Sequence, residues 1–176
     1  MLEIKDIHKT FNAGTVNEKR ALNGVNLHLE EGDFVTIIGG NGAGKSTTLN
    51  AVAGVWPVDA GRICIGGTDV TKLPEHKRAK YLGRVFQDPM TGTAAGMQIE
   101  ENMALAARRG AGRGLRVGIT KRERDEYREK LKSLGLGLED RLTAKVGLLS
   151  GGQRQALTLL MATLKKPQLL LLDEHT

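Results

Sequence analysis

The alternation of apolar and polar residues predicts two paired strands at the start of the chain and a buried strand after them. Apolar positions alternate partly over 2–7 and again over 22–29, with the polar run 12–20 between them, as in an antiparallel pair. Beyond the turn at 31–33, the segment 34–38 is β-branched and apolar on both faces, which is typical of a central strand covered by helices. Glycines then fill much of 39–44, and a helical segment over 45–53 follows, which Gly54 ends as a C-cap.

The second half of the chain has mainly helical spacing. Apolar residues at this spacing appear from Ile99 onward and are followed by a glycine-rich loop over 110–118. Thr120 and Glu123 match a capping box, so we expect a helix from there to about residue 134, where Gly135 ends it. A further helix through 164, a break at Pro167 and the leucine run 169–172 predict a final buried strand. Together these elements indicate an α/β fold.

Length and composition indicate one soluble domain. The 176 residues (19.0 kDa) suffice for one compact core and are too few for two of ordinary size. Mean hydropathy is -0.27, no apolar run approaches the ~20 residues of a membrane span, and the mixed charges at the start are unlike a secretory signal. We therefore expect a cytoplasmic protein. A single cysteine, Cys64, excludes an internal disulfide and is expected to serve packing alone.

The chain is basic, with 26 Lys and Arg against 20 Asp and Glu, a net charge of +6 and a pI near 9.6. Such a balance raises the question of nucleic acid binding. Only 3% of residues are aromatic, so no stacking platform for bases is predicted. The excess positive charge lies mainly between 108 and 132, where acidic residues are interspersed, and this mixture is typical of a solvated helix. We expect no nucleic acid partner.

A phosphate-binding motif lies between the predicted strand 34–38 and the helix 45–53. It fits G-x-x-x-x-G-K-[ST] and comprises Gly39, Gly40, Asn41, Gly42, Ala43, Gly44, Lys45 and Ser46, with Thr47 next in the helix. Glycines let backbone N–H groups face phosphates closely, and the helix N-terminus adds the positive end of its dipole. Lys45 would reach the β- and γ-phosphates of ATP, and the Ser46 hydroxyl would bind Mg2+. The alternative is a plain glycine turn that enters a helix.

The leucine run 169–172 ends in two carboxylates, Asp173 and Glu174. In a P-loop ATPase, Asp173 would hold Mg2+ through its water shell, and Glu174 would accept a proton from the attacking water. A strand that ends in Asp-Glu is common by itself. Combined with the upstream glycine loop, it predicts a catalytic role for Glu174.

The pentapeptide 149–153, LSGGQ, is the signature of ABC ATPases, and the chain resembles this family from its first predicted strand to its last residue. Ser150 and Gln153 also match a capping box, which would leave the N–H groups of Gly151 and Gly152 free at a helix start. The resemblance implies that these four residues contact the ATP bound to a second ATPase subunit. It therefore implies a dimer, expected to be a homodimer, with two ATP molecules between its chains.

The resemblance also assigns four parts to the single domain. It implies a P-loop NTPase core at 34–87, an N-terminal antiparallel β-subdomain at 1–33, an inserted helical subdomain at 88–148, and the signature helix with the last strand at 149–176.

Two further residues acquire roles from the resemblance. Gln87 corresponds to the glutamine that contacts Mg2+ and the attacking water; without the family match it would be an ordinary strand-end amide. Phe11 occupies the place of the aromatic residue that stacks on adenine, and the alternative for it is a core position. Gly40 stands where many relatives have proline, which removes no ligand.

The sequence departs from the family after Asp173 and Glu174. Relatives continue with a loop at the dimer contact, a strand leading to a switch histidine, and further helices; His175 is not that histidine. We therefore expect a partial chain that does not complete hydrolysis by itself. In relatives the absent strand lies between the counterparts of 34–38 and 169–172, so the isolated chain is expected to be aggregation-prone or partly disordered.

The resemblance implies the ATP-binding subunit of a bacterial-type transporter at the inner face of the cell membrane. The segment 98–102 is similar to the start of the helical subdomain in import ATPases, which favours import of an amino acid or another small organic solute. Membrane permease subunits and a solute-binding protein would then be partners. The alternatives are a soluble ABC ATPase of DNA repair or translation, and an inactive nucleotide-binding module.

Overall fold

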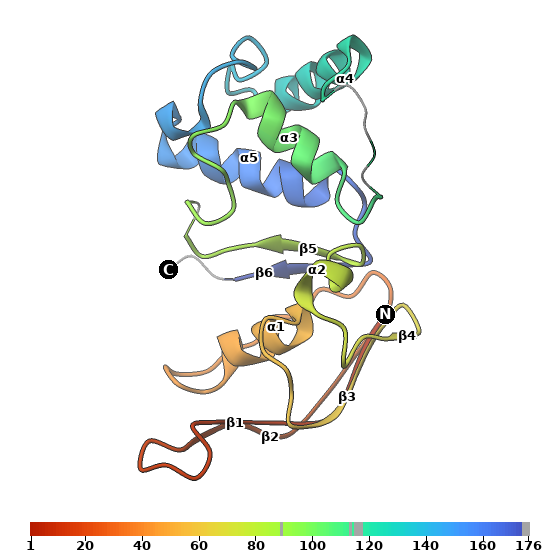
Figure 1. The fold of residues 1–176 in the computed structure, drawn as a ribbon, viewed down its shortest axis with the longest axis vertical. Coiled ribbons are helices and arrows are strands. Elements are labelled where there is room, and N and C mark those ends of the chain that lie inside the picture. Colours follow the sequence, from red (N-terminus) through yellow and green to blue (C-terminus); the bar gives the residue numbers. More distant parts are fainter. Residues whose placement is uncertain (89, 113, 115–117, 174–176) are drawn as a thin grey trace. The chain divides into compact units, whose positions relative to one another are not determined.

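The computed structural model describes residues 1–88, 90–112, 114 and 118–173, and the chain divides into two compact units, Met1–Leu82 and Gly83–Thr176. Figure 1 shows the elements of each unit. The first unit holds an antiparallel sheet and the glycine-rich loop, and the second holds most of the helical residues with a small sheet. The finer division into four parts stays a prediction.

A four-stranded antiparallel sheet in the order β2-β1-β3-β4 builds the first unit. Its strands are β1 (Leu2–Phe11), β2 (Lys19–Leu29), β3 (Ala60–Ile65) and β4 (Thr68–Asp69). β1 and β2 pair from Leu2 with Leu29 to Phe11 with Lys19, so the predicted pair is confirmed and both strands are longer than expected. Cys64 is buried in β3, as expected for a packing residue.

A helix follows the glycine-rich loop and is closed at its end by an arginine. This helix, α1 (Lys45–Ala53), ends at Gly54, whose φ of 83° confirms the predicted C-cap. The short helix α2 (Glu75–Arg78) ends on Arg78, which is 1% exposed. The Arg78 guanidinium donates to backbone carbonyls of α1 and of the segment before α2, namely those of Ala51, Val52, Thr71 and Leu73. No pattern in the sequence indicates this buried cation.

The segment 34–38 is not a strand, so the expectation of a buried central strand is wrong. Phe34 is 87% exposed and Ile38 is 90% exposed, with Val35 and Ile37 also open to solvent. The physical reason is pairing, because a strand needs a hydrogen-bonded neighbour and no described strand pairs with this segment. Its β-branched composition alone does not supply that neighbour.

The second unit contains a two-stranded sheet of β5 (Leu82–Val85) and β6 (Leu169–Leu172). Helices α3 (Ile99–Ala107) and α5 (Gly151–Thr163) both lie on one side of this pair (Figure 1). The expectation that 169–172 is a buried strand is only half right, because Leu171 alone is buried and Leu172 is 49% exposed. In a sheet of two strands, each strand keeps one open edge.

The helical core of the second unit joins α3 and α5 to α4 (Lys121–Lys132) and to the 3-10 turn η1 (Val146–Leu148). Its fully buried members include Ile99, Met103, Leu131, Leu138 and Leu157. Thr120 accepts a hydrogen bond from the Glu123 N–H, and Gly135 has a φ of 65°, so the predicted limits of α4 are confirmed to within two residues. No helix in the described part of the chain has the length and apolar character needed to cross a membrane.

Candidate nucleotide-binding site

The glycine-rich loop is held against strand β2. Gly42 and Gly44 have φ angles of 82° and 88°, a region that glycine adopts at little cost. A Cβ at Gly44 would lie 2.8 Å from the carbonyl oxygen of Ala21, so β2 leaves no room for a side chain there. The Ala43 N–H donates to the Gly40 carbonyl at 3.2 Å and closes a turn within the loop. The predicted motif therefore has a defined conformation and packs closely against β2.

The glycine-rich loop leads directly into α1, and no side chain caps the start of this helix. Helices α3, α4 and α5 each begin with a capping box, whereas α1 begins at Gly44 without a side-chain hydrogen bond. The first N–H groups of a helix have no partner within the helix, and they carry the positive end of its dipole. Those of α1 are thus free to bind an anion from outside the chain.

Lys45 lies over the loop that precedes it. Its ammonium donates to the carbonyl oxygen of Gly39 and, at 3.1 Å, to that of Gly40. These weak acceptors hold the cation at the loop, where phosphate oxygens would be stronger acceptors. Ser46 is exposed on the first turn of α1, and Thr47 is half-buried beside it.

Phe11 is half-buried at the end of β1 and contacts the only tryptophan of the chain. The rings of Phe11 and Trp56 meet edge to face, with centroids 4.9 Å apart. Asp59 fixes the same strand end by accepting from the Thr10 N–H at 2.6 Å and from the Lys9 ammonium at 3.0 Å. The backbone hydrogen bond from Thr10, together with Lys9, lowers the pKa of Asp59. Phe11 is thus an anchored aromatic at the surface, and it is not enclosed in the core.

Asp173 follows β6 and is half-buried. Its N–H donates to the Val85 carbonyl at 3.0 Å, and its carboxylate oxygen lies 3.7 Å from a guanidinium nitrogen of Arg84. Gln87 is exposed two residues beyond the end of β5. Glu174 lies outside the described residues, as does His175. No local pattern indicates the contact between Arg84 and Asp173, because the two residues are far apart along the chain.

The signature residues form an exposed helix start in the second unit. Ser150 accepts from the Gln153 N–H at 3.3 Å, and the Gln153 side chain accepts from the Ser150 N–H at 3.2 Å, so the predicted capping box is confirmed. Ser150, Gly151 and Gly152 are all exposed. The N–H groups of the two glycines therefore face solvent at the positive end of α5.

The ligands predicted for Mg2+ are oxygen donors from single side chains, without a cluster of metal-binding residues among the described part of the chain. The described residues contain no group of three or more His, Cys, Asp or Glu side chains arranged to hold a metal ion. The predicted ligands are instead the Ser46 hydroxyl, the Gln87 amide and the Asp173 carboxylate, all oxygen donors. Mg2+ takes oxygen ligands, keeps several waters and binds through substrate phosphates with one or two carboxylates.

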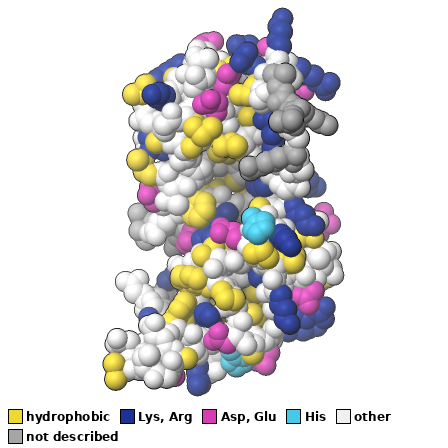
Figure 2. Space-filling view, viewed as in Figure 1, with side chains coloured by type: hydrophobic (Ala, Val, Ile, Leu, Met, Phe, Trp, Pro, Cys, Tyr) yellow, Lys and Arg dark blue, Asp and Glu magenta, His cyan; other side chains and the backbone are white. Residues whose placement is uncertain are grey.

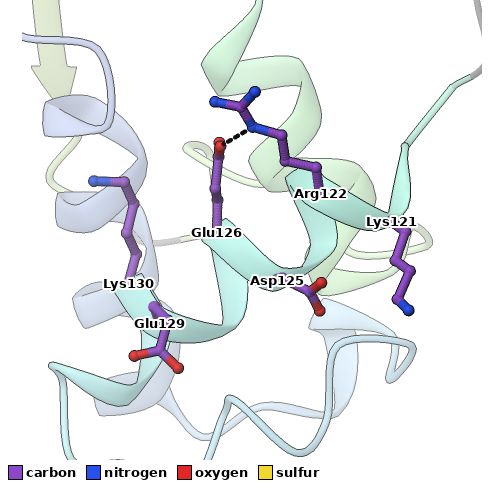
Figure 3. Close-up of a pocket in the computed structure, with 6 residues that line it drawn as sticks. All are labelled: Lys121, Arg122, Asp125, Glu126, Glu129 and Lys130. Carbon is purple, nitrogen blue, oxygen red and sulfur yellow. Dashed lines mark hydrogen bonds and ion pairs between the residues drawn. The ribbon is translucent and has the colours of Figure 1, made fainter.

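A hollow on the charged surface of α4 has mixed charge and does not resemble the glycine-rich loop. Figure 2 shows Lys and Arg side chains interspersed with Asp and Glu over the visible face. Figure 3 shows a surface hollow along α4, where Arg122 and Glu126 form an ion pair at 2.9 Å. The residues lining this hollow all come from that one helix and carry both signs of charge: Lys121, Arg122, Asp125, Glu126, Glu129 and Lys130. They form a solvated helix face, as predicted for this stretch.

Comparisons with known proteins agree with the class that the loop and signature define, an ATP-binding cassette. A family described as ABC transporter matches residues 22–176. The chain is 40% identical over 176 residues to a tyrosine transport ATP-binding protein of Clostridioides difficile (strain R20291), covering 100% of this chain and 70% of that protein. It is 36% identical over 177 residues to the spermidine/putrescine import ATP-binding protein PotA of Spiroplasma citri, covering 99% of this chain and 45% of that protein.

A solved structure supports the same assignment. A dimeric ATP-binding cassette in a post-hydrolysis state with bound ADP and Pi is similar with a TM-score of 0.81 and 30% identity, over 99% of this chain and 74% of that chain. The chain therefore belongs to the ABC transporter family, as an ATP-binding protein. The predicted family, α/β fold class and ATPase class are confirmed. The chain spans less than half the length of the polyamine relative.

Proposed function

We propose that this chain binds Mg-ATP on its glycine-rich loop and, paired with a second cassette, hydrolyses it to drive solute transport through separate membrane subunits. The observation that carries this proposal is the start of α1. Its N–H groups lack a side-chain cap, the loop before it has glycines at positive φ, and the Lys45 ammonium lies over that loop. This combination suits a polyphosphate and serves no evident purpose in packing.

Each residue has a role set by its chemistry. Lys45 binds the β- and γ-phosphates, the loop N–H groups donate hydrogen bonds to phosphate oxygens, and Phe11 stacks on adenine. Ser46, Gln87 and Asp173 would hold Mg2+, which neutralises charge on the phosphates when bound. Glu174 accepts a proton from the attacking water, and Gln87 orients that water.

The second half of the site comes from the partner cassette. Ser150, Gly151, Gly152 and Gln153 lie at an exposed helix start, where N–H groups and the Ser150 hydroxyl can meet a γ-phosphate. Phosphate bound at this point would bridge two chains, so ATP would favour the dimer. Mg2+, the homodimer, the permease subunits and a solute-binding protein are parts of the same proposal.

The proposed cargo is an amino acid or another small organic solute, moved into the cell, with the chain at the inner face of the membrane. The names of the tyrosine and polyamine relatives support this class of solute. The membrane and solute-binding subunits would choose the individual molecule.

The test measures ATP affinity by calorimetry on the full chain with Mg2+ present. Lys45→Ala should weaken ATP binding at least about tenfold, because a charge-assisted contact to phosphate is lost. Lys5→Ala is the matched control, since Lys5 lies on β1 and pairs with Glu3 at the surface. Equal affinity in wild type and Lys45→Ala would refute the phosphate site.

The composite site has its own test. In a protein that also carries the elements following Glu174 in relatives, Ser150→Arg should leave ATP binding by one chain intact and abolish ATP-driven dimerisation on gel filtration, because a bulky side chain would obstruct the partner's nucleotide. In the same longer protein, Glu174→Gln should retain ATP binding, lose turnover and accumulate the ATP-bound dimer. Unchanged dimerisation of Ser150→Arg would argue against a site shared between two chains.

A further inference from the structure

The start of β2 runs alongside the glycine-rich loop. A Cβ at Gly44 would meet the Ala21 carbonyl at 2.8 Å and a methyl of Leu22 at 3.2 Å. Two residues earlier in β2, the Lys19 ammonium approaches the same loop, because a Cβ at Gly42 would lie 3.7 Å from it. Lys19, Ala21 and Leu22 of β2 therefore lie along the loop between Gly42 and Gly44.

Lys19 also lies opposite the aromatic residue expected to stack on adenine. In the β1–β2 register Lys19 pairs directly with Phe11, and residues directly opposite in an antiparallel pair project to the same face of the sheet. The Lys19 side chain thus starts beside Phe11 and ends at Gly42. It spans the interval between the base-stacking position and the phosphate loop.

The Lys19 ammonium has no anionic partner among the residues that the structure describes. Over the described residues it takes part in no hydrogen bond or ion pair, and the neighbouring Glu18 carboxylate accepts from the Gly14 N–H at 2.7 Å instead. An exposed lysine usually extends into water, yet this one lies near Gly42, in the loop that leads to the uncapped start of α1. A cation beside a glycine-rich loop and an uncapped helix start favours binding of an anion there.

We propose that the Lys19 ammonium contacts the phosphate chain of the nucleotide, as a second lysine of the site beside Lys45. The inference rests on the proposed function, because it requires a nucleotide on the glycine loop. It adds a residue that the glycine motif does not contain. The ligand chemistry is a phosphate oxygen, so ATP and ADP should both use the contact and adenosine should not.

The experiment compares Lys19→Gln with Arg20→Gln by calorimetry, using ATP, ADP and adenosine as ligands of the full chain. Arg20 is the matched control, since it is the next residue of β2, is also exposed and projects to the opposite face. Lys19→Gln should weaken ATP and ADP about five- to tenfold and leave adenosine unchanged, while Arg20→Gln stays within about twofold of wild type. Lys19→Arg should retain most of the affinity, and Lys19→Glu should lose more than Lys19→Gln.

The outcomes separate this inference from the proposed function. If wild type binds ATP and Lys45→Ala does not, while Lys19→Gln and Lys19→Glu bind like wild type, the glycine loop is a nucleotide site and Lys19 is not part of it. If Lys19→Gln and Arg20→Gln weaken ATP equally, only the net charge matters, and the Lys19 contact is refuted. If wild type binds no ATP, the proposed function fails and the role of Lys19 fails with it.

Discussion

Arg78 offers the sharpest test of what holds the first unit together. Its guanidinium is buried and donates to the carbonyls of Leu73 and Ala51 at 2.7 Å and of Val52 and Thr71 at 2.9 Å. Burial lowers the pKa of Arg78, and the Asp69 carboxylate opposes that effect. The cation is therefore held mainly by backbone dipoles, including those at the negative end of α1.

Arg78→Ala removes every one of these donors. The Ala51 carbonyl keeps the N–H of Gly54 at 3.2 Å, so three carbonyls lose their donor, those of Val52, Thr71 and Leu73. Each unsatisfied buried acceptor costs about 1 to 3 kcal/mol. Water that enters the space left by the guanidinium, and relief from burying a charge, reduce the sum. Since the contacts to Thr71 and Leu73 are only part-buried, we expect the free energy of unfolding to fall by about 3 kcal/mol.

Urea unfolding of the full chain, followed by circular dichroism, measures this loss. With a slope of about 1 to 3 kcal/mol per molar urea, the midpoint of Arg78→Ala should fall by at least about 1 M. Arg122→Ala is the control, because that arginine pairs with Glu126 on an exposed helix face and should change little. A loss below about 1 kcal/mol for Arg78→Ala would refute the reasoning.

Gly54 provides an independent check on the same contact. A Cβ at Gly54 would lie 2.6 Å from the Arg78 Nε, and its φ of 83° also disfavours alanine. Gly54→Ala should therefore destabilise the wild type more than it destabilises Arg78→Ala, because only the wild type must also displace the guanidinium. Additive effects in this double-mutant cycle would show that the two residues do not interact.

Two further outcomes follow from the structure. Gly44→Ala should weaken ATP binding at least about tenfold by calorimetry, because the added Cβ meets the Ala21 carbonyl at 2.8 Å, whereas Gly118→Ala, with open space around it, should bind normally. The hydrogen bond from Arg124 lowers the pKa of Glu100, so this pair stabilises the fold above about pH 4.3 and loses its effect as pH falls through the lowered pKa. Glu100→Gln should thus be less stable than wild type at pH 7, with a gap that narrows in acid; a constant gap across a pH series of urea unfolding curves would contradict this.

Local sequence predicted the parts of the site whose chemistry depends on neighbouring residues. The loop 39–46, the cap between Ser150 and Gln153 and the helix end at Gly54 each rest on interactions over a few residues. Such interactions are encoded by spacing alone, which is why the motifs could be found without coordinates. Phe11 and Gln87 needed the family resemblance as well, because a single aromatic or amide residue carries no spacing signal.

Tertiary structure decided the features that depend on partners far along the chain. Lys19 lies near Gly42 only because the β1–β2 register and the packing of β2 against the loop bring them together. Arg78 donates hydrogen bonds to α1 although the two are more than twenty residues apart in the sequence. The same dependence explains the failure at 34–38, where β-branched residues favour a strand but no described strand supplies hydrogen bonds. The sequence determines which kinds of group each residue can bind, and the tertiary structure determines which of those groups lie close enough to bind.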